Sequence, residues 1–544
     1  MLILLKGGRI IDPVNERDEI GDLWIKGGRI AAPPLGRLAD EVHNVSGKIV
    51  MAGGIDIHSH IAGGNVNTAR LLLPEMHRSR LPRKAGLPLS TAKWSTFETG
   101  TLYAAMGFTT VIEPAIVPHQ ALQAHLELSD IPIIDKGILT VLGNDDFLLS
   151  LLRDGEGPAA VADYVASAIG ASNGLGVKCI NAGGAAAFKY NARTFSLDDV
   201  VPFYGLSSRQ IVEALQQAVW DLKIPHPLHL HANNLGIPGN VSTALATIEA
   251  ARGERLHLAH LQFYAYGNEG DRGFSSAAAE LAAAVNAAPN VTVDVGQVMF
   301  RQTVTISADV LRQFNGAEAA RPKKSVIHDG DGNGAGIVPY LYRENDFVNA
   351  VQWACGLELF MLIDNPWQVF FTTDHPNGAP FTTYPEIFAL IMSRDARAEA
   401  TARLPQDAVA MTALPSIARE YNLNEIAIMT RAAPAKLLGL KDRGHLGEGG
   451  LADVAVYSPG KDIAKMFRFA HLVFKDGDLV VRDGVVTHYR WGKALKVNPG
   501  YDKAIDRRLT GYYDHHFGVS RDLFAVNENL LPRAGTVREV ACAR

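Results

Sequence analysis

The chain is poor in cysteine. Its 544 residues include three cysteines, Cys179, Cys355 and Cys542, which lie far apart and form no C-x-x-C pair. This spacing argues against disulfides, against a Cys₄ zinc site and against an iron–sulfur cluster bound by this chain alone. Any redox chemistry would therefore need another subunit.

The chain also lacks long apolar runs and a strong charge imbalance. No run reaches the roughly 20 apolar residues that span a bilayer, and the first eight residues, MLILLKGG, contain neither a basic leader nor a small-residue cleavage site. The formal net charge is −5, so neither nucleic acid nor an anionic membrane is expected as the main partner. We therefore expect a cytoplasmic protein without a membrane span.

Short strands separated by glycine turns mark both ends of the chain. The predicted strands are residues 2–5, 23–25 and 48–51 at the N-terminal end, and 453–457, 472–474, 479–481 and 485–488 at the C-terminal end. Two β-rich ends around a long α/β middle favour one small β-sandwich built from residues 1–50 and 441–499.

The middle of the chain, residues 51–440, alternates strands with helices. The predicted strands are 109–112, 138–142, 228–231, 256–261, 291–295 and 370–373, and the predicted helices are 210–222, 277–287 and 424–438. Because no dinucleotide fingerprint is present, this alternation favours an α/β fold with a (β/α)₈ TIM-like barrel over an open doubly wound sheet. Inserts are expected near 62–95 and 300–345, and residues 500–544 are expected to form a polar, irregular C-terminal extension.

Residues that can bind metal follow several of these strands. In the segment GIDIHSH at 54–60, the period-two alternation of a strand places His58 and His60 on one face, about 7 Å apart, where both imidazoles can hold one ion. Lys178 interrupts an apolar strand at 175–180. A buried lysine is costly unless it is paired or neutralised, for example as a carbamate; the alternative is a strand-end lysine that reaches solvent.

Two further histidine pairs and one acid complete the set. The pairs are His229 with His231 and His257 with His260, and Asp374 follows the aromatic strand at 370–373. Each residue alone could be a satisfied core residue. The ordered set predicts two metal ions at the C-terminal ends of the barrel strands, and therefore hydrolysis.

This order resembles the amidohydrolase superfamily. Its members bind metal through H-x-H after the first barrel strand, a carboxylated lysine on the fourth, histidines on the fifth and sixth, and an aspartate on the eighth. The metal ligands that the resemblance implies are His58, His60, Lys178, His231, His260 and Asp374. It also implies that Asp374 is the catalytic acid and base, and the run HANN at 231–234 favours His231 over His229.

Longer motifs resemble the A subunits of formylmethanofuran dehydrogenases and of formyltransferase/hydrolase complexes. These motifs are HLHANNLG at 229–236, HLQF at 260–263, TTDHPNGAPF at 372–381 and the stretch 63–70. The resemblance implies two Zn²⁺ or similar divalent ions, a carboxylated Lys178 and a methanofuran-type carrier as substrate. The carrier's N-formyl group would be hydrolysed to formate and free amine, or formed in reverse, by a protein that works with the other subunits of such a complex.

Polar residues near these motifs could hold the carrier. The candidates for substrate binding are Asn67, Arg70, Asn233, Asn234 and His375, and the candidates for binding an acidic carrier tail are Arg78, Arg80, Arg83 and Lys84 in the basic run 77–84. The alternative for the basic run is a solvated or subunit-contacting surface.

Three other functions remain open at this stage. They are the formyl-condensing subunit of a CO₂-reducing formylmethanofuran dehydrogenase, a hydantoinase-like or dihydroorotase-like cyclic amidohydrolase, and a catalytically inactive scaffold. The long inserts argue against a cyclic amidohydrolase, and the intact ligand set argues against a scaffold.

The segment 329–334 resembles the start of an EF-hand loop, but its twelfth position is Tyr340 rather than Glu, so no calcium site is expected. The run YYDHH at 512–516 is expected to pack in the tail rather than to bind metal.

Overall fold

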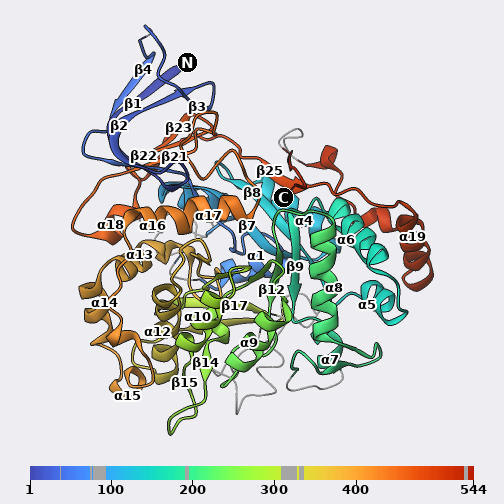
Figure 1. Cartoon of the computed structure of the whole chain (residues 1–544). Helices are drawn as coiled ribbons and strands as arrows, with labels where there is room; N and C mark the ends of the chain where they lie inside the picture. The colour runs from blue at the N-terminus through green and yellow to red at the C-terminus, as the bar shows by residue number, and fades with distance from the viewer. Residues whose placement is uncertain are drawn as a thin grey trace, which may run out of the picture.

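The computed structural model describes residues 1–36, 38–73, 76, 94–189, 195–307, 328–329, 336–531 and 537–543. Within these residues a parallel α/β barrel forms the body of the molecule, and a second sheet extends from one end of it (Figure 1). The predicted fold class is confirmed.

The barrel is built from eight parallel strands of the described chain, each paired with the next. They are β6 (Gly54–Asp56), β7 (Phe108–Ile116), β8 (Asp135–Leu142), β9 (Gly176–Ile180), β12 (Leu228–His231), β13 (Leu256–Leu258), β16 (Val291–Asp294) and β20 (Val369–Phe370). The last strand meets the first just beyond their ends, where the His60 N–H donates to the carbonyl of His375 at 2.9 Å. The residues that follow the first and eighth strands are thereby brought together.

Helices connect the barrel strands and pack around them (Figure 1). They are α3 (Thr96–Ala105), α4 (Ala121–Ser129), α5 (Asp146–Arg153), α6 (Pro158–Ser172), α7 (Gly184–Lys189), α8 (Ser208–Asp221), α9 (Val241–Ala250), α10 (Ala278–Ala287), α12 (Phe347–Leu362), α13 (Tyr384–Met392), α14 (Arg394–Thr401), α15 (Gln406–Val409), α16 (Leu423–Ala427) and α17 (Ala433–Leu437). Helix α8 begins with a capping box between Ser207 and Gln210 and buries Ile211 and Leu215, one turn apart. The predicted helix at 424–438 is α16 and α17, joined by a π-helical turn at Ile428–Ala432.

The second sheet joins the two ends of the chain. Its nine strands in the described chain are β1 (Leu2–Asp12), β2 (Arg17–Lys26), β3 (Arg29–Ala31), β4 (Glu41–Asn44), β5 (Ile49–Ala52), β21 (Val454–Tyr457), β22 (Leu472–Lys475), β23 (Asp478–Arg482) and β24 (Val485–Val486). Strands β5 and β21 pair antiparallel, with Ala52 opposite Val454, and this sheet encloses its own apolar core. Strand β25 (Ala494–Val497) pairs instead with barrel strand β8. The predicted domain boundaries at 50, 440 and 499 stay predictions.

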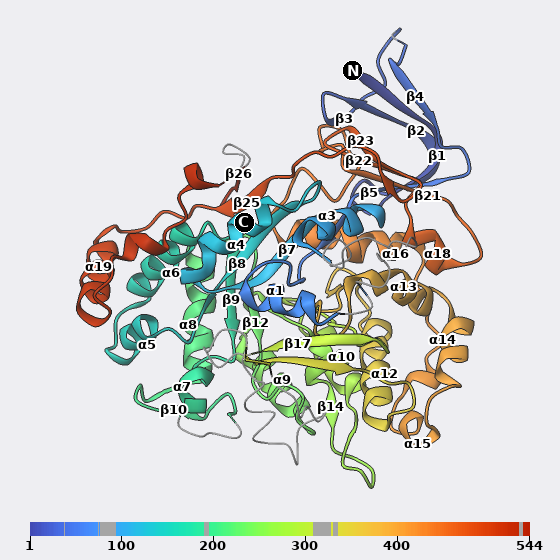
Figure 2. The same cartoon turned by 180° about the vertical axis from the view of Figure 1, so that it is seen from behind.

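The two predicted inserts meet each other. Helix α1 (Gly64–Leu71) of the first insert contacts an antiparallel sheet of the second, made of β17 (Gln302–Ser307), β18 (His328–Asp329) and β19 (Gly336–Leu341) (Figure 2). The basic residues Arg78, Arg80, Arg83 and Lys84 and most of the segment 329–334 lie outside the described residues.

The prediction of an irregular C-terminal extension was wrong. Helix α19 (Ala504–His516) contacts α6, and β26 (Val537–Val540) pairs with β25 at the edge of the barrel sheet. Ile505 and Leu509, one turn apart, are the buried residues of α19, a short apolar stripe that its polar composition hides. No helix in the described parts of the chain is long and apolar enough to cross a membrane.

Candidate metal centre

All six candidate metal ligands are buried at the ends of barrel strands or within them. His58 and His60 follow β6, Lys178 lies within β9, His231 ends β12, His260 follows β13 and Asp374 follows β20. None is more than 9% exposed. The structure thus brings together residues that span more than 300 positions of the sequence.

His58, His60 and Asp374 form a first donor set. The Nε2 atoms of His58 and His60 lie 2.9 and 3.4 Å from the same oxygen, Oδ1 of Asp374. Two ligands about 2.1 Å from a tetrahedral zinc ion are roughly 3.3 Å apart, so these separations suit three ligands of one ion. Thr372 fixes the arrangement, because its hydroxyl donates to the His58 carbonyl at 2.6 Å and accepts the Asp374 N–H at 2.9 Å.

His231, His260 and Lys178 are the candidates for a second donor set. Nε2 of His260 lies 3.0 Å from Nδ1 of His231, and Lys178 lies on the strand beside β12. The Lys178 side chain is 2% exposed, and its Nζ has no hydrogen-bond partner within the described residues. Burial lowers the pKa of Lys178 to about 8. A carbamate on this amine would remove the buried cation and add oxygen ligands, so the donor set fits a two-metal centre.

The backbone at two candidate ligands lies in the left-handed region. His260 has φ +36° and Asp374 has φ +50°, conformations that cost a residue with a side chain on the order of 1 kcal/mol or more and that cluster at functional sites. Gly296 makes room for one of them, because a Cβ at position 296 would lie 2.5 Å from the Cβ of His260. The fold therefore holds both ligands in strained backbone positions.

Charged neighbours set the ionisation of this cluster. Burial alone would lower the pKa of His60, but the carboxylates of Glu113 and Asp374 outweigh it and raise that pKa to about 9. Burial would raise the pKa of Asp374, yet His260 and His58 hold it well below its usual range. Asp374 is therefore ionised at neutral pH and can accept a proton.

Two acids of the candidate site, Glu113 and Asp294, were not predicted from the sequence. Glu113 accepts the Nδ1–H of His60 at 3.0 Å, and Asp294 accepts that of His58 at 2.9 Å. His257 and His229 lie beside Asp294, at 3.1 and 3.6 Å from its Oδ2. In the sequence, each of these acids is the single acid of a buried strand: Glu113 in FTTVIEPAI and Asp294 in VTVD.

The predicted substrate-binding residues of the first insert also hold the chain in place. The Arg70 guanidinium donates to the carbonyl of Ile61 and to Oδ1 of Asn67, and it lies 5.5 Å from the centre of the Trp94 ring. Burial lowers the pKa of Arg70 to about 10. Asn67 donates to Glu127 at 2.7 Å. These bonds order the loop that leads away from His60.

The remaining predicted substrate-binding residues have different surroundings. Asn233 donates to Ser208 at 3.0 Å and Asn234 to Thr243 at 2.9 Å, which ties the loop after β12 to α8 and α9. His375 is fully buried, and its Nε2 has no hydrogen-bond partner in the described part of the chain. Burial lowers the pKa of His375, and the charges of Arg70, His60 and Asp374 also act on it.

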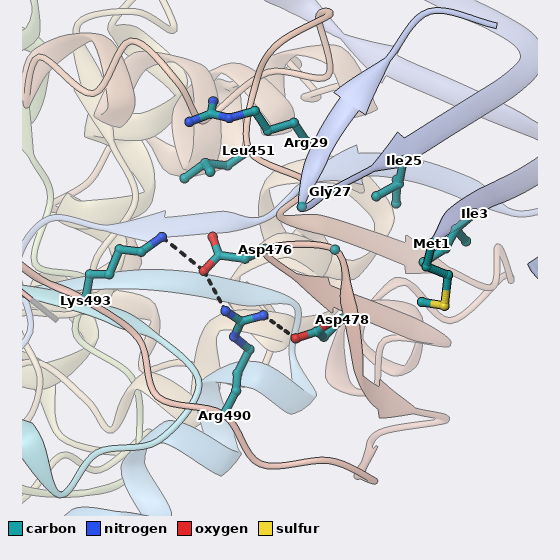
Figure 3. Close-up of a pocket in the computed structure, with 12 residues that line it drawn as sticks. Met1, Ile3, Ile25, Gly27, Arg29, Leu451, Asp476, Asp478, Arg490 and Lys493 are labelled. Carbon is teal, nitrogen blue, oxygen red and sulfur yellow. Dashed lines mark hydrogen bonds and ion pairs between the residues drawn. The ribbon is translucent and has the colours of Figure 1, made fainter. Parts of the chain in front are cut away.

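A pocket of about 500 Å³ lies away from this centre, where the second sheet meets the segment before β25 (Figure 3). Arg490 and Lys493 point into it, and both bond to Asp476, at 3.0 and 3.1 Å. None of the candidate ligands lines this pocket. Arg490 and Lys493 are thus paired with an acid, and the pocket lies apart from the candidate ligands.

Comparison with known proteins agrees with this geometry. The Amidohydrolase family model matches residues 41–488. The chain is 52% identical to the A subunit of the formyltransferase/hydrolase complex Fhc of Methylorubrum extorquens over the whole of both chains, and 38% identical to protein FwdA of Methanocaldococcus jannaschii over 92% of this chain and 91% of that one. The crystal structure of the Methylorubrum extorquens FhcABCD complex with methylofuran contains a chain that covers 100% of this one at 52% identity, with a TM-score of 0.94.

The predicted resemblance to such A subunits is confirmed by these matches. The matching family is one of metal-dependent hydrolases, and the described residues include groups that could hold a metal ion. The chain therefore belongs to the amidohydrolase family.

Proposed function

We propose that this protein hydrolyses the N-formyl group of a methylofuran-type one-carbon carrier to formate and the free amine. It does so as the hydrolase subunit of a multi-subunit formyltransferase/hydrolase complex. The observation that carries the proposal is the full-length match to one component of such a complex, which was crystallised with methylofuran, together with the two buried donor sets.

The residues that would hold two divalent ions, taken as zinc, are His58, His60 and Asp374 for one and His231 and His260 for the other, with carboxylated Lys178 as a further proposed ligand. When bound, zinc ions polarise a carbonyl oxygen and lower the pKa of coordinated water to about 7. Their donor atoms are imidazole nitrogens and carboxylate or carbamate oxygens, which are ligands that zinc prefers.

Asp374 is the proposed catalytic residue. Its carboxylate is ionised, because His260 and His58 keep its pKa low, so it can take the proton of the attacking water. The same carboxyl group then gives that proton to the nitrogen of the breaking C–N bond, since an amine leaves poorly unless it is protonated. Formate and the free amine result, and no other reactant is needed.

The residues around Asp374 would orient the carrier. His375 follows it directly and has a buried, unpartnered Nε2 within the described structure, which suits a hydrogen bond to the formyl group. Arg70 and Asn67 order the loop after His60, and Asn233 and Asn234 order the loop after β12. We propose that substrate selection depends on these two loops.

The same site could run in reverse, condensing formate with the amine as in a CO₂-reducing dehydrogenase. The match to FwdA, at 38% identity, supports this second direction. The 52% match over full length favours hydrolysis.

The test uses the full chain, produced together with the other subunits of its complex. Metal content is measured by plasma emission and formate release with an N-formyl furfurylamine carrier. About two zinc ions per chain with formate release would support the proposal. Metal without formate release, in the intact complex, would refute the proposed substrate. Metal-free protein that still releases formate would refute the mechanism.

A further inference from the structure

Two buried acids lie directly behind the candidate ligands His58 and His60. Asp294 Oδ2 is 2.9 Å from Nδ1 of His58, and Glu113 Oε1 is 3.0 Å from Nδ1 of His60. Both acids are 0% exposed. We propose that Asp294 and Glu113 are positioning residues that hold the ring proton of each histidine on Nδ1 and leave Nε2 free for metal. This inference rests on the metal centre of the proposed function.

The chemistry of the contact decides which nitrogen carries the proton. A neutral imidazole has one N–H, and an ionised carboxylate can only accept. An imidazole that gives its Nε2 lone pair to a metal ion keeps one proton, on Nδ1, the nitrogen that faces Asp294 in His58 and Glu113 in His60. Nε2 of each ring faces Asp374, the third donor of the first set. With the other tautomer, an N–H would occupy the position that a metal ion needs.

Asp294 acts on both donor sets. Its Oδ2 accepts from His58 and from Nε2 of His257, at 2.9 and 3.1 Å, while its Oδ1 accepts the backbone N–H of His260 at 2.7 Å. One carboxylate thus fixes the ring of a ligand in the first set and the strained backbone of a ligand in the second. The hydroxyl of Thr292, 2.9 Å from Nδ1 of His257, can donate to that nitrogen and keep the His257 proton on Nε2.

A neighbouring histidine does not disturb this assignment. Nε2 of His229 lies 3.0 Å from Nδ1 of His58, and Nδ1 of His229 lies 3.0 Å from Nε2 of His226. If His229 donates to His226, its Nε2 is a second acceptor for the His58 proton. Both neighbours of His58 Nδ1 then favour a proton on that atom.

Glu113 joins a metal ligand to the loop that carries Arg70. Its Oε2 accepts the N–H groups of Ile61 and Ala62, at 2.6 and 3.0 Å, while its Oε1 holds the ring of His60. The carbonyl of Ile61 in turn accepts from Arg70. Glu113 therefore sets the orientation of His60 and the path of the chain beyond it together.

Amide variants test the tautomer without changing side-chain size. In Asp294→Asn, the backbone N–H of His260 can only donate, so the remaining oxygen must face it and the NH₂ group must face His58 and His257. His58 Nδ1 would then face an N–H donor in place of a carboxylate and keep the neutral His229 Nε2 as an acceptor, which weakens the hold on its proton and favours the tautomer with the proton on Nε2. In Glu113→Gln, two backbone N–H groups hold the remaining oxygen in the same way, and the NH₂ group faces His60.

The experiment measures zinc affinity by competition with a chelator in metal-free complexes that carry each variant. We expect zinc to bind 10- to 100-fold more weakly in both, the loss typical of acids that support a ligand histidine. The thermal midpoint of the metal-free protein should change little, and X-ray absorption of the zinc-loaded variants should report fewer histidine ligands per ion.

Glu358→Gln is the matched control. Glu358 is equally buried on α12, and its carboxylate accepts from Ser276 and from the N–H of Ala413 rather than from any candidate ligand. The control should keep the zinc affinity of the unchanged protein. Full affinity in both Asp294→Asn and Glu113→Gln would overturn the inference, and so would an equal loss in the control. If Asp294→Asn does not fold, Glu113→Gln decides by the same criterion.

The affinity measurement needs no substrate, so the inference and the proposed function can fail separately. An unchanged protein that binds two zinc ions without releasing formate refutes the function. The comparison of zinc affinities still decides whether the two acids position the ligands.

Discussion

Replacing Lys178 by methionine should make the metal-free protein more stable and its metal centre incomplete. Burial lowers the pKa of Lys178 from 10.5 to about 8. Each pKa unit corresponds to about 1.4 kcal/mol, so a protonated Lys178 costs the metal-free fold up to about 3 kcal/mol at neutral pH. This cost already includes the attraction of Asp294 and Asp374 for the ammonium. We therefore expect a gain of up to about 3 kcal/mol for Lys178→Met at neutral pH.

The dependence on pH gives this prediction a definite sign. The pKa of Lys178 is lower in the folded chain than in the unfolded one, so the unfolded chain binds the proton more tightly. The full cost is present below about pH 8, where both states are protonated, and it disappears as the pH rises toward about 10.5. The advantage of Lys178→Met in calorimetric unfolding of metal-free protein should therefore be largest near neutral pH and shrink in alkali.

Lys475→Met is the matched control, because Lys475 is a second fully buried lysine with partners. Its Nζ bonds to Asp135 and Asp453, at 3.0 and 2.8 Å. These two carboxylates and that of Asp476 outweigh burial and raise the pKa of Lys475. Removing one member of a buried ion pair typically costs about 3–5 kcal/mol. The two lysine variants should thus change stability in opposite directions.

The metal-loaded arm of the same experiment tests the site. Methionine cannot form a carbamate, so Lys178→Met should hold at most one zinc ion where the unchanged protein holds about two, and formate release should fall more than roughly 100-fold. The reasoning is refuted if metal-free Lys178→Met is no more stable than the unchanged protein near neutral pH. Retention of full metal and activity would refute the role of Lys178 in the site.

Three other variants test separate parts of the argument. Asp374→Asn cannot shuttle a proton, so formate release should fall about 10²- to 10⁴-fold; a loss fully explained by the measured metal content would contradict a catalytic role. Arg70→Lys keeps the positive charge but loses the guanidinium that bonds to both Ile61 and Asn67. We therefore expect KM for the formyl carrier to rise more than kcat falls. Equal changes in KM and kcat would count against a role of this loop in binding. Burial raises the pKa of Glu358 to about 7, so ionisation of this carboxyl destabilises the fold as the pH rises from about 4.5 through 7. Glu358→Gln should therefore raise the thermal midpoint above about pH 7 and change it little near pH 5. An equal gain in the thermal midpoint at both pH values would refute this reasoning.

The fold and the candidate ligands were predictable because each has a periodic or ordered signal. His58 and His60 alternate along a strand, and parallel barrel strands must end at one rim, so the chain order of His231, His260 and Asp374 already places them together. The structure confirms this barrel. The features that were missed depend on contacts between distant parts of the chain. In the C-terminal extension, helix α19 packs on α6 and β26 pairs with β25.

Glu113 and Asp294 show why part of the site could not be predicted. Their partners His60 and His58 are 53 and 236 residues away in the sequence, and one acid within an apolar strand has no spacing to interpret. Asn234 shows the opposite problem, because an amide beside a ligand motif has both donors and acceptors and suits either substrate or backbone. In the structure it bonds to Thr243.

The interior of the barrel explains why Lys178 is the most informative residue of the site. Barrel interiors are usually filled by branched apolar side chains, but here Lys178, His229, His257 and Asp294 are all buried beside the ligands. His257 is hydrogen-bonded to Asp294, and His229 is hydrogen-bonded to His58 and His226. Lys178 alone among these four has no hydrogen-bond partner in the described structure, and an unpaired buried ammonium is unstable in such surroundings. The carbamate that we propose would remove this ammonium, so the metal-free chain should carry a cost that filling the site removes.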